Sequence, residues 1–137
     1  MKKKMKNLRD VTSNIIERMF FMNEETIPDH FNNTFVYCSS INHPNLKIEL
    51  YCGEELANIL TKNFLGIDEV NESDILDALK EILNMIAGNY VGEYLKDFPT
   101  SIPVPNSTVL PKNFKIKNKY CEVLFYESLP FCISLKE

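Results

Sequence analysis

The sequence predicts a single α+β domain over residues 1–137, with a largely antiparallel sheet flanked by helices. Three observations support this prediction. Apolar residues make up 45% and charged residues 25% of the chain, as in an average folded soluble domain. Helical periodicity and two-residue alternation occupy separate stretches of the sequence. The elements follow the order helix, two strands, two helices and three strands, which is typical of α+β proteins.

The N-terminal part is predicted to form a helix followed by a β-hairpin. Apolar residues recur at helical spacing over residues 7–22, whereas the lysine-rich residues 1–7 are expected to form a frayed basic tail. Residues 34–41 and the alternating residues 46–52 are predicted to be strands. The polar residues 42–45 between them have the composition of a turn, so the two strands are expected to pair.

Two helices are predicted in the middle of the chain. Residues 54–65 place their apolar side chains on one side, and Gly66 follows as a C-terminal cap. A longer helix is predicted over residues 71–96, with Asn71 or Ser73 as its N-cap.

The C-terminal part is predicted to contain three strands. Pro103 and Pro105 end the helical stretch and fall within an irregular strand over residues 101–110. Because proline lacks an N–H group, this strand is expected at a sheet edge or with a bulge. Residues 120–126 and 131–135 are predicted to be two further strands.

Charge and hydropathy exclude several function classes. The net charge is −4, but the first nine residues carry +5, so residues 10–137 carry −9. An acidic body argues against nucleic acid as the main partner, which would require a clustered basic surface. We expect no membrane contact, because the sequence has no apolar stretch long enough to span a bilayer. The basic start lacks the apolar region of a signal peptide, so a cytoplasmic location is expected.

The cysteine pattern predicts free thiols rather than a metal site. Cys38, Cys52, Cys121 and Cys132 lie far apart in predicted strands, without C-x-x-C spacing. In a reducing compartment such residues are typically buried thiols. No metal or other cofactor is therefore expected in this chain.

The long helix has two distinct faces. Projected at 100° per residue, its apolar residues form one core-facing stripe: Ile75, Leu76, Leu79, Ile82, Leu83, Ile86, Tyr90 and Tyr94. A row of acidic, amide and glycine residues lies on the opposite side: Asp74, Asp77, Glu81, Asn84 and Gly88.

Two members of this row are unfavourable inside a helix. Glycine costs about 1 kcal/mol relative to alanine, and the side chain of asparagine competes with the backbone hydrogen bonds. Gly88 is explained if another backbone approaches closely, and Asn84 and Glu81 would then be polar groups aimed at a partner. On helix geometry alone, however, an ordinary solvated face explains the row better than a docking surface.

The segment from Glu81 to Asn89 resembles the E-x-x-N-x-x-x-G signature of the CheC/CheX/FliY chemotaxis phosphatases. It is most similar to the CheX branch, which has one such site per chain. The order of the predicted elements also matches that branch over nearly the whole chain. Leu83 and Lys80 depart from the pattern, because glycine is common at both positions in the family.

The resemblance implies a CheC/CheX-like fold and a protein substrate, the phosphorylated receiver domain of a CheY-like response regulator. It implies that Asn84 orients the water that attacks the aspartyl phosphate and that Glu81 pairs with a lysine of the receiver. Asp77 and Gly88 would be partner-docking residues on the same face. The Mg²⁺ ion of the reaction would belong to the receiver and not to this chain.

Other interpretations remain open at this stage. The same fold family includes non-catalytic receiver-binding adaptors and flagellar-switch scaffolds, and an α+β domain with an unrelated partner is also compatible with the sequence. The branch resemblance further suggests a homodimer formed through sheet edges. The sequence does not identify the cognate receiver or the signalling pathway.

Overall fold

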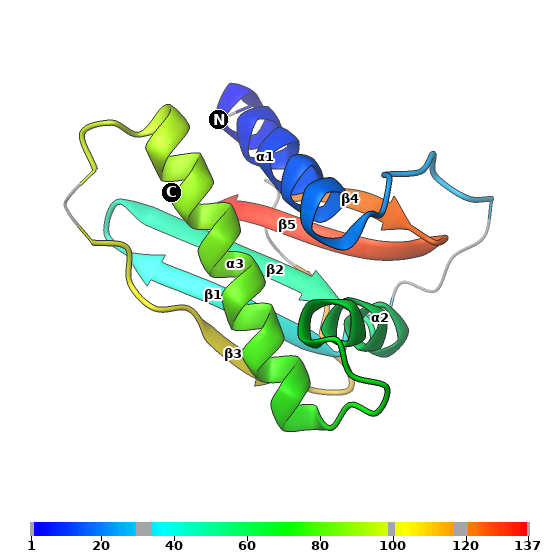
Figure 1. Cartoon of the computed structure of the whole chain (residues 1–137). Helices are drawn as coiled ribbons and strands as arrows, with labels where there is room; N and C mark the ends of the chain where they lie inside the picture. Colours follow the sequence, from blue (N-terminus) through cyan, green and yellow to red (C-terminus); the bar gives the residue numbers. More distant parts are fainter. Residues whose placement is uncertain (1, 30–33, 99–100, 117–120, 137) are drawn as a thin grey trace.

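The computed structural model describes residues 2–29, 34–98, 101–116 and 121–136. Three helices cover one face of a five-stranded antiparallel sheet, as Figure 1 shows, so the predicted fold class is confirmed. The strand order is β3-β1-β2-β5-β4. The elements are α1 (Lys2–Phe20), β1 (Tyr37–His43), β2 (Leu46–Cys52), α2 (Glu54–Leu65), α3 (Glu72–Tyr94), β3 (Asn106–Val109), β4 (Cys121–Tyr126) and β5 (Leu129–Lys136).

The main core lies between the sheet and the helix layer. Alternate residues of β2, such as Ile48 and Leu50, are fully buried beneath the helices. The other face of the sheet carries a smaller cluster around Tyr51, whose ring stacks on Phe114 with centroids 5.3 Å apart. Alternation in β2 accounts for the face beneath the helices, and Tyr51 on the opposite face adds a second apolar layer.

The N-terminal prediction requires a correction. Helix α1 begins at Lys2, so a frayed tail is wrong for residues 2–7. Met5 is only 4% exposed and lies three residues before the fully buried Leu8 on the same helix face. Burial of Met5 in the core offsets the unfavourable position of several lysines at a helix N-terminus. At the other end, α1 stops at Phe20, two residues before the predicted boundary.

The C-terminus of α2 and the N-terminus of α3 have the expected caps. Gly66 adopts the left-handed conformation after α2, with φ of 66°. Asn71 caps α3 through a capping box: its side chain accepts a hydrogen bond from the Asp74 N–H at 2.9 Å, and its own N–H donates to the Asp74 carboxylate at 3.1 Å. These caps fix where α3 begins, and hence which residues its outer face presents.

The sheet edges agree with the proline pattern. Pro103 and Pro105 precede β3, which is shorter than the predicted strand over residues 101–110 and lies at an edge beside β1. The opposite edge is β4, and residue 120 of its predicted range lies outside the described residues. Strand β5 begins two residues earlier than predicted.

The cysteines are free thiols. Cys38, Cys52 and Cys132 are buried, and Cys121 is half-buried. Burial raises the pKa of both Cys38 and Cys52 to about 12, so these thiols stay protonated at neutral pH. The prediction of buried free thiols is confirmed for Cys38, Cys52 and Cys132.

Candidate functional site

Helix α3 places one face in the core and leaves the other open to solvent. It packs against the sheet and beside both α1 and α2 (Figure 1). Leu79, Ile82 and Ile86 are fully buried along the inner face. The predicted stripe is correct in its middle, but Leu76 is only half-buried and Tyr94 is 38% exposed, because the helix ends extend beyond the sheet.

The predicted surface row is present on the outer face of α3. Asp77, Glu81, Asn84 and Gly88 are all exposed. Their spacing of four, three and four residues keeps them within about 60° of one another around the helix. The row extends over about 16 Å along the helix axis. Asp74 is excluded from this row as a partner contact, because its carboxylate accepts a hydrogen bond within the capping box.

The two central side chains have no partner among the described residues. Neither the side chain of Glu81 nor that of Asn84 forms a hydrogen bond or an ion pair with another group of that part of the chain. Other helical asparagines behave differently, because the amide of Asn58 donates to the Glu54 carbonyl at 3.0 Å and that of Asn89 donates to the Met85 carbonyl at 2.8 Å. The amide of Asn84 therefore remains available to an incoming molecule.

The glycine of the row is not required by the packing of this chain. A Cβ atom added at Gly88 or at Gly92 would have no neighbour within 4 Å. Gly53 provides a contrast, because a Cβ there would lie 2.9 Å from the carbonyl oxygen of Thr34. Since glycine destabilises a helix by about 1 kcal/mol, an external reason for Gly88 is needed.

The electrostatics of the row favour a cationic partner group. Asp77 and Glu81 are one turn apart, and two like charges at this spacing destabilise a helix by a few tenths of a kcal/mol. A single ammonium group of a partner would relieve this repulsion and could donate hydrogen bonds to both carboxylates. The neutral Asn84 beside them adds a donor and an acceptor without further charge.

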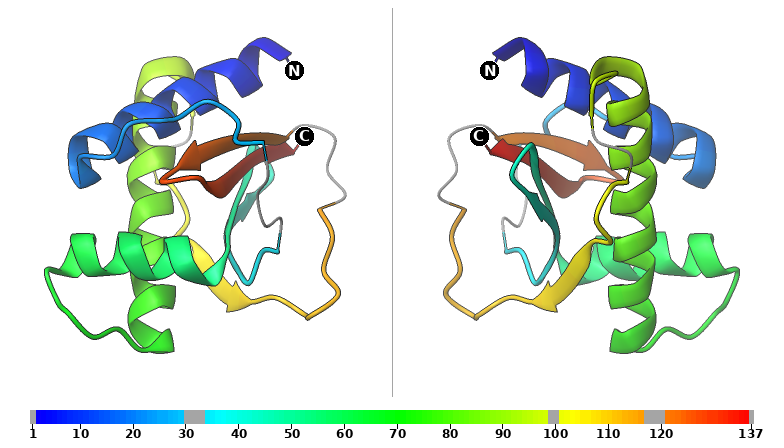
Figure 2. Two further views of the ribbon diagram at one scale, coloured as in Figure 1. Left: turned by 90° about the vertical axis from the view of Figure 1, so that its right-hand side faces the viewer. Right: turned by 90° about the vertical axis from the view of Figure 1, so that its left-hand side faces the viewer.

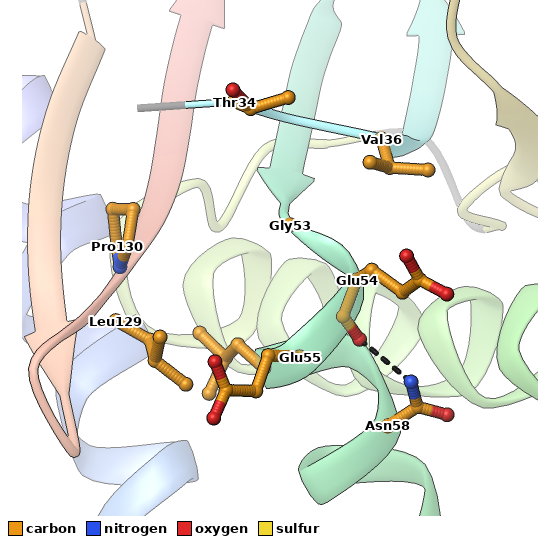
Figure 3. Close-up of a pocket in the computed structure, with 9 residues that line it drawn as sticks. Thr34, Val36, Gly53, Glu54, Glu55, Asn58, Leu129 and Pro130 are labelled. Atoms are coloured by element: carbon orange, nitrogen blue, oxygen red, sulfur yellow. Dashed lines mark hydrogen bonds between the residues drawn. The ribbon is translucent and has the colours of Figure 1, made fainter. Parts of the chain in front are cut away.

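The row lies outside the hollow that Figure 3 shows. This hollow of about 480 Å³ lies at the N-terminus of α2, between Gly53, Asn58 and Pro130, and no residue of α3 lines it. Glu54 and Glu55 also line it, and their carboxylates would repel a phosphate group. The exposed face of α3 therefore suits a macromolecular partner better than an enclosed small ligand.

The described residues contain neither a candidate metal site nor a helix that could span a membrane. No three His, Cys, Asp or Glu side chains of that part of the chain are grouped so that they could hold a metal ion. Among the described helices, none combines the length and the apolar character needed to cross a membrane.

A comparison with protein families decides the assignment. The model of the family described as "Chemotaxis phosphatase CheX" matches residues 41–127, which is more than half of the chain and includes the whole row on α3. The chain belongs to the CheX family. The resemblance predicted from the segment Glu81–Asn89 and from the order of the elements is thereby confirmed.

Solved structures of CheX proteins share the fold. A chemotaxis protein CheX from Desulfovibrio desulfuricans is 17% identical, with a TM-score of 0.71, and the alignment covers 98% of this chain and 99% of that one. CheX from Vibrio vulnificus is 15% identical, with a TM-score of 0.68 and coverage of 95% and 93%. A CheX-CheY-BeF3-Mg+2 complex from Borrelia burgdorferi matches at 17% identity, with a TM-score of 0.67 and coverage of 96% and 97%. No curated protein sequence matches this chain.

Proposed function

We propose that this CheX-family chain is a phosphatase that hydrolyses the aspartyl phosphate of a CheY-like receiver domain. The observation that carries the proposal is the pair Glu81 and Asn84, which lie on the exposed face of α3 without partners in the described part of the chain. Both residues fall within the segment that the family model matches. The complex of CheX with CheY from Borrelia burgdorferi supports the receiver as the partner class.

In this proposal Asn84 positions the nucleophile. Hydrolysis proceeds by in-line attack of water on phosphorus, and catalysis of phosphoryl transfer relies chiefly on positioning and electrostatics. The amide carbonyl of Asn84 accepts a hydrogen bond from the attacking water, while its NH₂ group can donate to a phosphate oxygen. An uncharged side chain is suitable here because it adds no repulsion toward the anionic acyl phosphate.

Glu81 fixes the approach of the receiver. Its carboxylate pairs with a lysine ammonium group of the receiver, and a charge-assisted contact of this kind supplies both register and binding energy. Asp77, one turn earlier, adds negative potential for the same cation. Gly88, one turn after Asn84, allows the backbone of the receiver to come close to α3.

The metal ion of the reaction is assigned to the substrate. We propose that Mg²⁺ is bound by the receiver beside its acyl phosphate, where it neutralises charge on the phosphoryl oxygens. The Borrelia burgdorferi complex, which contains Mg²⁺ together with CheY and BeF3, is consistent with this arrangement. This chain then contributes only the side chains on α3.

We also propose a homodimer formed through a sheet edge. The outer edges belong to β3 and β4, and Glu25 already forms an isolated bridge to Phe125 of β4. Because this bridge occupies part of the β4 edge, β3 is the more open of the two. Light scattering at high protein concentration tests the dimer, and a strictly monomeric chain would contradict it.

The phosphatase assignment is tested by release of inorganic phosphate from a CheY-type receiver phosphorylated with acetyl phosphate and Mg²⁺. The wild-type chain should accelerate release, and Asn84→Ala should abolish the acceleration while still binding the receiver. Binding of the wild-type chain without acceleration would instead identify a receiver-binding adaptor. Full activity of Asn84→Ala would refute the proposed role of Asn84.

A further inference from the structure

The C-terminal end of α1 carries apolar side chains that the fold does not bury. Phe21 is 91% exposed and Met19 is 47% exposed. Phe21 also adopts the left-handed conformation, with φ of 56°, and its N–H donates to the Glu17 carbonyl at 3.1 Å. Glycine or asparagine is usual at such a position, so a bulky side chain there is strained. Strain and exposure in one residue point to a role outside the packing of this chain.

Met19 lies at the edge of the buried stripe of α1. Leu8 and Thr12 are fully buried on this stripe, Ile15 is half-buried, and Met19 follows four residues later on the same side. At the end of the helix the buried side is formed instead by Ile16 and Phe20, which are 0% and 3% exposed, and Met19 lies beside it. Both views in Figure 2 show that the C-terminal ends of α1 and α2 project beyond the outer surface of α3.

The docking face, which is the outer side of α3 that carries the row from Asp77 to Gly88, is consequently bordered on one side by a rim. This rim is the C-terminal end of α1. Asn84 is exposed on α3. The C-terminal end of α1 extends beyond the outer surface of α3 on the side where α1 and α2 pack (Figure 1 and Figure 2). Any globular domain that reaches Asn84 must fit beside this rim.

The size of a protein interface requires contacts beyond α3. The row from Asp77 to Gly88 is about 16 Å long, and a helix with its side chains is about 10 Å wide. The resulting strip offers about 160 Å² in projection, whereas a specific interface buries about 800 Å² on each partner. Part of the missing contact must come from neighbouring elements, and α1 packs directly against α3.

We propose that Met19 and Phe21 form an apolar contact with the receiver domain and thereby determine which receiver is bound. The inference rests on the proposed function, since it assumes that a receiver docks on Asn84. The expected partner is a receiver with an exposed apolar side chain next to its phosphorylation site. Aromatic residues commonly supply the anchoring contacts of such interfaces.

This apolar contact is distinguishable from the Glu81 contact by its response to salt. An exposed ion pair weakens as ionic strength rises, whereas burial of apolar surface does not. The Met19 and Phe21 contact also lies away from the reacting atoms. It should therefore contribute to receiver affinity without changing the turnover of bound receiver.

The test uses the double variant Met19→Gln, Phe21→Asn in the full chain. Glutamine keeps the helix, and asparagine adopts the left-handed conformation readily, so the fold should be retained. The probe is a CheY-type receiver, bound as its beryllofluoride–Mg²⁺ complex or phosphorylated with acetyl phosphate. The expected result is an increase of about 10-fold in Kd and KM, equal at low and high salt, with unchanged kcat and an undiminished melting temperature.

Two matched variants define the control. Ile27→Ser replaces another exposed residue (72% exposed), on the segment after α1 that Figure 1 shows running away from α3, and it should leave Kd unchanged. Val104→Ser replaces a residue that is 82% exposed on the segment along the opposite side of α3. An increase in Kd for Val104→Ser but not for the double variant would place the receiver on the other flank and overturn the inference.

The remaining outcomes separate this inference from the proposed function. If turnover depends on Asn84 but the double variant binds the receiver normally, only the inference fails. If the double variant changes the oligomeric state and not the receiver affinity, Met19 and Phe21 contact a second copy of the chain, and the inference also fails. If the wild-type chain neither binds the receiver nor accelerates release of phosphate, the proposed function fails and the inference with it.

Discussion

Glu81 and Asn84 lie three residues apart on the outer face of α3, both exposed and both without a partner in the described part of the chain. At this spacing their side chains project from neighbouring points of one helix face, so a single partner surface can contact both. Neither contributes a contact that holds the fold together. Substitutions at the two positions should therefore report on recognition and catalysis separately from stability.

Asn84→Asp is the sharpest change at the proposed catalytic position. It keeps the shape of the side chain but adds a negative charge next to an anionic acyl phosphate, and it removes the NH₂ donor. We expect the stimulated rate of phosphate release to fall on the order of 100-fold, with little change in melting temperature. Stopped-flow measurement of receiver dephosphorylation gives the rate, and a variant as fast as the wild type would rule out a positioning role.

Glu81→Gln removes the charge that is proposed to pair with a receiver lysine. A charge-assisted hydrogen bond contributes about 1.5–3 kcal/mol, so we expect Kd for the receiver to rise by about 10-fold or more. The loss should be greatest at low salt, because the missing interaction is electrostatic.

Glu93→Gln is the matched control for this change. Glu93 is also exposed on α3 but points about 120° away from Glu81 around the helix. It carries the same charge, so a general effect of net charge would appear equally in both variants. Equal losses of affinity in the two variants would contradict a specific contact at Glu81.

Gly88→Ala should change stability and activity in opposite directions. A Cβ atom at this position meets nothing within 4 Å, so the variant should be more stable by about 1 kcal/mol through helix propensity alone. The same methyl group would obstruct close approach of a receiver backbone, so KM should rise. Urea unfolding and steady-state kinetics measure the two effects.

Gly92→Ala separates the effect of helix propensity from the effect of close approach by the receiver. It also meets open space and lies one turn beyond Gly88, so it should give a similar gain in stability. Any loss of activity at Gly88 beyond that at Gly92 reports on close approach to the row. A Gly88→Ala variant that is stabilised and fully active would remove Gly88 from the docking face.

The row on α3 was predictable because helical periodicity and capping are local properties of the sequence. The positions of Glu81 and Asn84 follow from the 3.6-residue repeat once Asn71 fixes where the helix begins. That Glu81 and Asn84 lie on the face away from the core could be predicted without knowing which elements pack against α3. The family resemblance then supplied the functional meaning that helix geometry alone did not.

Features that depend on packing between distant elements were not predictable in this way. Met5 lies at helical spacing from Leu8, but the lysines around it favoured a frayed end, and only the packing of the first turn of α1 against the core shows that it is buried. The left-handed conformation of Phe21 also follows from where α1 ends in the fold. The apolar sequence around Phe21 was visible, but only the packing of the fold separates the exposed Met19 and Phe21 from the buried Phe20.

Asn71→Ala tests the N-cap of α3, which fixes where the helix begins and therefore where the row lies. The variant loses the hydrogen bond from the Asp74 N–H and weakens the reciprocal bond, so it should be less stable by about 1 kcal/mol. Because the row begins more than one turn later, turnover per folded molecule should stay within about 2-fold of the wild type. Thermal unfolding and the kinetic assay measure the two effects, and Ser73→Ala provides a control at an exposed position in the same turn.

Thiol labelling tests the burial of the cysteines. At pH 8 a disulfide reagent should modify the half-buried Cys121 in the native protein, whereas Cys38, Cys52 and Cys132 should react only on unfolding.

Because burial raises the pKa of the Cys38 and Cys52 thiols, it should also make the stability of the fold depend on pH. The pKa of Cys38 and Cys52 is about 12 in the folded chain, against an ordinary value of 9.0, so the folded state binds these protons more tightly than the unfolded state. Their contribution to stability is therefore complete below pH 9 and is lost as pH rises from 9 toward 12. Urea midpoints of the wild type and of Cys52→Ala should converge over this range. A constant difference between the two would mean that Cys52 is not held in an apolar site.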